Sequence, residues 1–135
     1  RITDDVLENP DIVTYGYPNM TNTSRDSSYL KNCNISAAFM SYGMYIQTET
    51  GTTVDASELG VKDIKVQIKN GIFWNTIATS GGGSVTNDHT FCGSCDCTNA
   101  VSGETYRIKC THYAYIGGNY YHYDNTTDGF KYVKP

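Results

Sequence analysis

The sequence predicts an all-β domain, a two-sheet antiparallel sandwich of about seven strands, and three observations support this. Leu, a strong helix former, occurs only three times in 135 residues. Thr and Tyr, which suit the half-buried face of a sheet, occur 17 and 12 times. Apolar and polar residues also alternate with a period of two over several stretches. The length suits a single domain with its own core.

Residues 1–28 are predicted to be a leading segment, and residues 29–135 form the predicted β-sandwich domain. Thr3 is placed to cap a short helical turn whose first residues are acidic, and Pro10 ends that turn. The role of the segment stays open between a solubilising lead, a strand-donating arm and the remnant of a linker.

The first two strands follow this segment. Residues 33–39 place their apolar side chains on one parity, which is typical of a strand with one face on a core. Residues 44–50 form the second strand, which Gly51 ends. Residues 54–60 are predicted to be a connection, with one helical turn capped by Asp55.

The clearest strand covers residues 64–69, where Ile and Val alternate with Lys and Gln. Asn70-Gly71 follows at once, and both residues tolerate a positive φ. This dipeptide between alternating runs predicts a β-hairpin whose return strand covers residues 72–78. Gly81-Gly82-Gly83 then predicts a flexible loop.

Three further segments complete the predicted domain. Residues 85–91 form a weaker strand, and residues 92–103 form a Cys-rich loop. Residues 106–111 alternate between apolar and polar side chains and predict a strong strand. After a turn at Gly117-Gly118-Asn119, the last strand covers residues 121–133.

Charge and hydropathy exclude several classes of protein. The net charge is −4 and no cluster of Lys and Arg is present, so we expect no nucleic-acid binding. No run of about 18 apolar residues is present, so we expect no membrane span. Five cysteines are many for a cytosolic chain of this size. We therefore expect a secreted or cell-surface protein whose leader has been removed.

Two stretches match a known pattern of strands. Ser102-Gly103-Glu104-Thr105-Tyr106-Arg107-Ile108-Lys109-Cys110 resembles the loop and strand F of fibronectin type III modules. The hairpin over residues 64–78, with Trp74 on its second strand, is similar to the C–C′ hairpin of those modules. Their usual Trp on strand B has no counterpart here. The resemblance implies an immunoglobulin-like or fibronectin-III-like sandwich in which the Tyr106 hydroxyl bonds back to nearby backbone as a tyrosine corner.

Short motifs carry a second resemblance. Thr53-Val54-Asp55, Leu59-Gly60-Val61, Tyr106-Arg107-Ile108-Lys109 and Thr111-His112-Tyr113-Ala114 resemble motifs of small exported proteins of uncharacterised function from Gram-positive bacteria. This resemblance implies an exported bacterial protein and implies no activity.

Two cysteines lie on predicted strands. Cys33 and Cys110 share the parity of their apolar neighbours and are predicted to point inward. There they are candidates for an inter-sheet disulfide, like that of immunoglobulin domains, or for two unpaired core thiols.

The other three cysteines lie close together, and we expect one local disulfide joining Cys92 to Cys97 or Cys95. Two alternatives are that all three thiols are free, or that they form a Zn²⁺ site with His89 as fourth ligand. Four ligands within nine residues are a cramped set, because zinc sites usually draw their second pair from a separate turn. Since five is an odd number, at least one thiol is unpaired or joins another chain.

Aromatic residues supply the candidate binding surface, and many of them lie in the last hairpin. The candidates are Trp74, Tyr113, Tyr115, Tyr120, Tyr121 and Tyr123. Exposed aromatic rings stack on sugar rings or anchor a protein partner. The alternative is that every second Tyr packs on the core while the others cover the sheet face.

We predict no catalytic residue and no cofactor, because His89, His112 and His122 belong to no recognisable catalytic motif. The expected function is a secreted or cell-surface, non-enzymatic binding or adhesion module for a protein or glycan. One alternative is a carbohydrate-binding domain that uses Trp74 and the tyrosines. Another is an exported structural protein with a Cys/His metal site. The partner, the oligomeric state and the disulfide pairing stay open.

Overall fold

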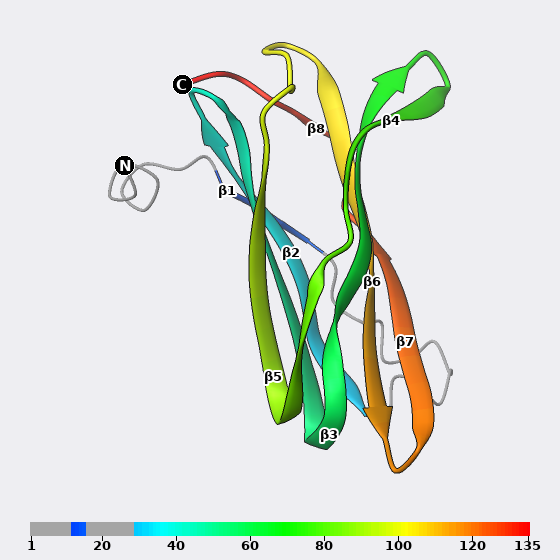
Figure 1. Ribbon diagram of the computed structural model, residues 1–135. Coiled ribbons are helices and arrows are strands. Elements are labelled where there is room, and N and C mark those ends of the chain that lie inside the picture. Colours follow the sequence, from blue (N-terminus) through cyan, green and yellow to red (C-terminus); the bar gives the residue numbers. More distant parts are fainter. Residues whose placement is uncertain (1–11, 16–28) are drawn as a thin grey trace.

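The computed structural model describes residues 12–15 and 29–135 (Figure 1). These residues form strands joined by turns and loops, and none of them lies in a helix. The strands build one antiparallel sheet that curls into a half-barrel. The prediction of an all-β antiparallel domain is therefore confirmed. Among the described residues the structure has no helix with the length and apolarity needed to cross a bilayer.

The strands are, in chain order, β1 (Ile12–Tyr15), β2 (Leu30–Met40), β3 (Gly43–Asn70), β4 (Phe73–Ser80), β5 (Gly83–Cys97), β6 (Thr105–Ile116), β7 (Asn119–Thr126) and β8 (Phe130–Lys131). Across the sheet, β1, β2, β3, β6 and β7 follow one another, and β8 pairs with β6. Strands β4 and β5 pair with the opposite edge of β3. The predicted helical turn that Thr3 would begin lies outside the described residues.

Strand β3 runs for 28 residues and pairs with four other strands, β2, β4, β5 and β6 (Figure 1). Its first part lies between β2 and β5, and its second part pairs with β6. The register shifts between Gly51 and Ala56 against β5, and between Lys62 and Lys65 against β6. Because such bulges bend a strand and increase its twist, they account for the curl of the sheet.

The predicted connection over residues 54–60 is wrong, because these residues lie inside β3. Ala56 and Leu59 are buried, with β5 paired along one edge of this stretch and β6 along the other. Pairing on both edges overrides a local preference for a turn. Asp55 caps no helix, and its carboxylate lies 3.3 Å from Nδ1 of His89.

Tight turns set the register of two hairpins. Asn70 pairs with Phe73, so the predicted hairpin is confirmed, although its two central residues are Gly71 and Ile72. The β6–β7 hairpin turns at Gly117-Gly118, as predicted, and both glycines have a positive φ, at 59° and 82°. Two central residues with positive φ are typical of a type I′ turn, whose twist matches that of the strands.

Two further predicted boundaries differ from the structure. Cys92–Cys97 continue β5 and do not form a loop, which begins only after Cys97. Cys97 is buried and Asp96 is exposed, the alternation of a strand with one face on the core. The predicted last strand over residues 121–133 is divided into β7 and β8.

The core fills the inside of the curl, where β2 contacts β6 and β7. Large side chains that are fully buried there include Leu30, Ile35, Met44, Ile46, Leu59, Ile108, Tyr106 and Tyr132. The Tyr132 hydroxyl donates a hydrogen bond to the Met40 carbonyl and ties the last segment to β2. The amide of Val101 donates a 2.7 Å hydrogen bond to the Tyr106 hydroxyl, so Tyr106 makes the backbone contact that the resemblance assigned to it.

Candidate functional site

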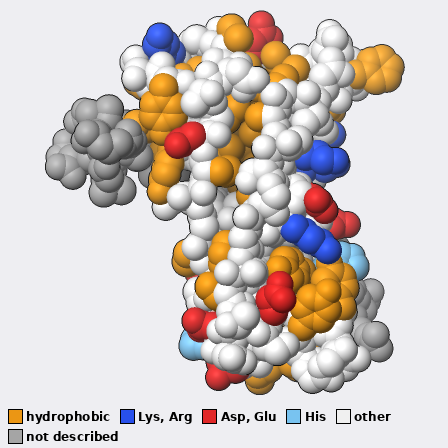
Figure 2. All heavy atoms as spheres, viewed as in Figure 1, with side chains coloured by type: hydrophobic (Ala, Val, Ile, Leu, Met, Phe, Trp, Pro, Cys, Tyr) orange, Lys and Arg blue, Asp and Glu red, His pale blue; other side chains and the backbone are white. Residues whose placement is uncertain are grey.

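The outer face of the β6–β7 hairpin carries a cluster of aromatic side chains. The two-residue turn pairs Tyr115 with Tyr120 and Tyr113 with His122. Successive side chains on a strand point to opposite faces, so these four lie together on the side away from the core. We call Tyr113, Tyr115, Tyr120 and His122 the aromatic patch. Figure 2 shows apolar side chains gathered at the β6–β7 end, next to basic and acidic ones.

The rings of the aromatic patch contact one another. Tyr120 and His122 stack with centroids 5.5 Å apart and an angle of 18° between their planes. Tyr113 and Tyr120 stack at 6.2 Å and 30°, and Tyr115 lies 5.1 Å from Tyr120 in a tilted arrangement. Tyr115 and Tyr120 are 41% and 37% exposed, whereas Tyr113 is 9% exposed. The patch is thus a packed group of rings with two exposed members.

Strand β3 places one positive and one negative side chain against the patch. The Lys62 ammonium lies 4.8 Å from the Tyr120 ring centroid and 5.4 Å from that of Tyr113, which are cation–π distances. Its contact with the Tyr120 side chain raises the pKa of Lys62. The Tyr113 hydroxyl donates a 2.6 Å hydrogen bond to Oε2 of Glu58. Burial, together with this hydrogen bond, raises the pKa of Tyr113.

The other predicted surface aromatics lie elsewhere. Tyr121 is buried in the core, and Tyr123 packs against the core and stacks on His112 at 6.3 Å. Trp74, on β4, is half-buried with the Arg107 guanidinium 4.5 Å from its ring centroid. The structure therefore brings Tyr113, Tyr115 and Tyr120 into one surface, whereas Tyr121 and Tyr123 pack on the core.

All five cysteines lie in the described residues, and none is in a disulfide. Cys33 and Cys110 are 0% and 4% exposed, which confirms that both point inward, but they are unbonded. Neither the predicted inter-sheet disulfide nor the predicted local disulfide is present in this structure. Successive strand residues alternate between faces, which places Cys92 on the opposite side of β5 from Cys95 and Cys97.

The same alternation separates the four residues of the alternative metal site. Cys92 is exposed, Cys97 is buried, and the His89 side chain is 60% exposed beside Asp55 and Asp88. Among the described residues, no group of three or more His, Cys, Asp or Glu side chains is arranged to hold a metal ion. The geometry does not bring His89, Cys92, Cys95 and Cys97 together as ligands.

Thiol reactivity is expected to follow this burial. Alkylation of the folded chain at mildly alkaline pH should modify the exposed Cys92 first and leave Cys33 and Cys110 protected until the chain unfolds. Burial raises the pKa of Cys33 to about 12 and raises that of Cys110 further, so both lack the reactive thiolate. Non-reducing mass mapping with and without denaturant measures this. Equal labelling of the three thiols, or a mapped bond between Cys33 and Cys110, would contradict the structure.

A polar network lies in the core beside these thiols. The Thr50 hydroxyl donates to the Gly60 carbonyl at 3.0 Å, so it accepts the hydrogen bond from Nδ1 of His112 at 2.8 Å. The Asn125 amide nitrogen can only donate, and it lies 3.0 Å from Nε2 of His112. The contact with Thr50 requires a proton on Nδ1, and the contact with Asn125 requires an unprotonated Nε2. Together they require the neutral imidazole with its proton on Nδ1.

The surroundings of His112 oppose a second proton. The ring is fully buried, and Nε2 also accepts from the Cys110 thiol at 3.4 Å. A proton on Nε2 would point at the Asn125 amide nitrogen, which can only donate, while burial lowers the pKa of His112 to about 4. The second amide hydrogen of Asn125 goes to the Cys33 carbonyl at 3.1 Å, so the network ties β7 to β2. His112 is therefore a structural residue with no access to solvent.

Comparison with known proteins finds no matching family model, no matching curated protein and no matching solved structure.

Sequence reasoning found the tyrosines of the patch but not their neighbours. Lys62 and Glu58 come from β3, more than fifty residues earlier than the tyrosines they contact, and no local pattern links them. The position of His122 beside Tyr113 could have been predicted, because a two-residue turn at Gly117-Gly118 pairs these two residues.

Proposed function

We propose that this chain is a secreted or cell-surface, non-enzymatic binding module that recognises a protein partner through the aromatic patch. The observation that carries the proposal is the exposure of Tyr115 and Tyr120 on a hairpin closed by a two-residue turn, flanked by Lys62 and Glu58. Tyr is enriched among the residues that dominate binding energy at protein interfaces. A preformed cluster of contacting rings also loses little conformational entropy on binding.

Ring accessibility favours a protein partner over a glycan. A sugar stacks on the open face of an aromatic ring, but Tyr120 has Lys62, Tyr113 and His122 against its ring. Arg107 in the same way covers a face of Trp74, the other predicted sugar platform. A protein partner can contact such a cluster without needing a free ring face, because its side chains and backbone also reach ring edges and hydroxyl groups.

We propose no catalytic role for this module. The placement of the histidines supports this: His112 is enclosed in the core, His122 belongs to the patch, and His89 lies beside Asp55 and Asp88 on the surface. We further propose that the chain is bacterial and that the two halves of the curled sheet correspond to the two sheets of an immunoglobulin-like or fibronectin-III-like sandwich. The hydrogen bond between Val101 and the buried Tyr106 hydroxyl supports this arrangement.

Selection from a displayed peptide library tests the proposal. Most peptides selected on the wild-type domain should lose at least about tenfold in affinity for the variant Tyr115→Ser/Tyr120→Ser, because both exposed anchors are removed. The matched control is Phe73→Ser, which removes an aromatic ring that is 67% exposed at another hairpin. Binding that is lost with Phe73→Ser and kept in the patch variant would contradict the proposal. Glycan-array binding that depends on Tyr115 and Tyr120 would support the carbohydrate alternative instead.

A further inference from the structure

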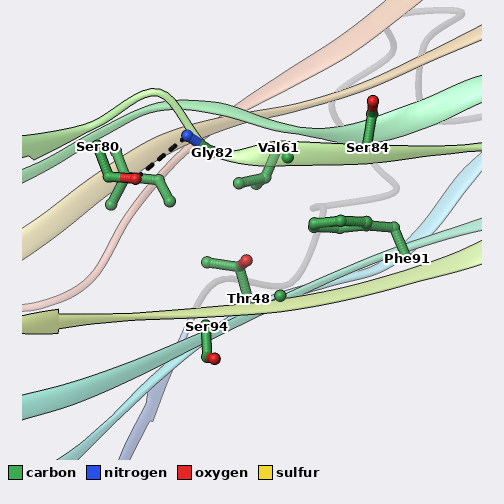
Figure 3. Close-up of a pocket in the computed structure, with 10 residues that line it drawn as sticks. Thr48, Val61, Ser80, Gly82, Ser84, Phe91 and Ser94 are labelled. Atoms are coloured by element: carbon green, nitrogen blue, oxygen red, sulfur yellow. Dashed lines mark hydrogen bonds between the residues drawn. The ribbon is translucent and has the colours of Figure 1, made fainter.

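A cavity of about 270 Å³ lies inside the curl, between β3, β5 and the turn that joins β4 to β5 (Figure 3). Its floor is formed by Val61, Ile64 and Phe91, which are 2%, 5% and 7% exposed. Ser80 and Gly82 form one rim, where the Gly82 amide donates a 3.2 Å hydrogen bond to the Ser80 hydroxyl. The cavity lies on the inner side of the sheet and is therefore separate from the aromatic patch.

The lining determines what kind of molecule fits. Among the described residues it contains no charged side chain, and its buried members are Val61, Ile64, Phe91 and the polar Thr48. A charged ligand would lose its hydration without gaining a partner there. Ser84 and Ser94 also line the cavity, but Figure 3 shows their side chains directed away from it. The lining thus favours a neutral ligand that has both an apolar part and a polar group.

Thr48 supplies one polar contact at the centre. Thr48 is only 4% exposed, and in Figure 3 its side chain projects from β3 into the space between Val61 and Phe91. Within the described part of the chain, the Thr48 hydroxyl makes no hydrogen bond. This hydroxyl is therefore available to hydrogen-bond a ligand that brings one donor or acceptor into the cavity.

We propose that this cavity binds a small neutral phenol, with its ring against Phe91 and its hydroxyl on Thr48. A cavity of roughly 150 Å³ already holds a benzene ring, so this one accommodates a single ring with a substituent. Contact between the two aromatic rings adds to the apolar burial. The hydroxyl group distinguishes the ligand class from plain hydrocarbons, because only a polar atom satisfies Thr48.

Titration of the ¹⁵N-labelled domain with phenol, toluene and benzoate tests the proposal by amide shift changes. Phenol should bind with shifts around Thr48, Val61 and Phe91, and about tenfold more tightly than toluene, which has the same shape without the hydroxyl. Benzoate should not bind, because the cavity has no partner for its charge. Equal affinity for phenol and toluene, or shifts centred elsewhere, would overturn the proposal.

Thr48→Val supplies the decisive comparison, since it removes the hydroxyl at nearly constant volume. This variant should lose the preference for phenol, about tenfold, while toluene binds at least as tightly as before. Thr90→Val, on the same sheet at an exposed position of β5, is the matched control and should leave both affinities unchanged. An unchanged phenol affinity in Thr48→Val would mean that an ordered water satisfies Thr48, and the proposal would fail. Retained toluene binding shows that the variant is folded.

Discussion

Replacing Gly60 with Ala is expected to lower the free energy of unfolding by roughly 3 kcal/mol. An added Cβ would lie 2.1 Å from the Gly83 carbonyl oxygen and 2.8 Å from the Cα of Ser84. Both are backbone atoms of β5, so the clash is relieved only if β5 moves away from β3. The Gly60 carbonyl also accepts the hydrogen bond of Thr50, so the shift reaches the polar network of the core.

Chemical denaturation followed by the fluorescence of the single Trp, Trp74, measures this loss. Gly81→Ala is the matched control, because a Cβ there meets nothing within 4 Å and the backbone needs no left-handed conformation. That variant should change stability by less than about 1 kcal/mol, with a small gain favoured because Ala restricts the unfolded chain. A loss at Gly60 that is no larger than the one at Gly81 would show that β3 and β5 are not in close contact there.

The sequence predicted those parts of the fold that depend on neighbouring residues. Alternation over residues 64–69 and the Asn70-Gly71 dipeptide located the β3–β4 hairpin, because side-chain period and turn chemistry are local properties. The turn lies one residue later than the dipeptide suggests. A glycine at the first central position allows a type II′ turn at Gly71-Ile72 as readily as a type I′ turn one residue earlier.

The parts that were missed depend on distant contacts. Residues 54–60 contain acidic and small residues that favour a turn, and only pairing with β5 and β6 keeps them in β3. Likewise, the register of the β6–β7 hairpin decides which tyrosines face the core and which face solvent. Their contacts with Lys62 and Glu58 depend instead on how β3 pairs with β6. Long-range pairing of this kind leaves no periodic signal in the sequence.

Lowering the pH from about 7 to about 5 is expected to cost about 2 kcal/mol of stability through His112 alone. The pKa of His112 is about 4 in the folded chain, against 6.5 for an unperturbed His. In this interval the unfolded chain therefore binds a proton that the folded chain does not, so stability falls as the pH falls. The loss begins near pH 6.5, grows to about 3 kcal/mol and levels off below about pH 4.

Denaturation curves across this pH range separate His112 from the other two histidines. His89→Gln/His122→Gln leaves His112 as the single His of the chain and should keep the pH dependence of the wild type. His112→Gln should be less stable at neutral pH, because it disrupts contacts with Thr50, Cys110 and Asn125. Between about pH 7 and about pH 5, however, this variant should lack the fall in stability that His112 causes in the wild type. The slope therefore distinguishes a buried neutral imidazole from a merely bulky core residue. A double variant without the slope, or a His112→Gln variant that retains it, would show that His112 is accessible to protons in the folded chain.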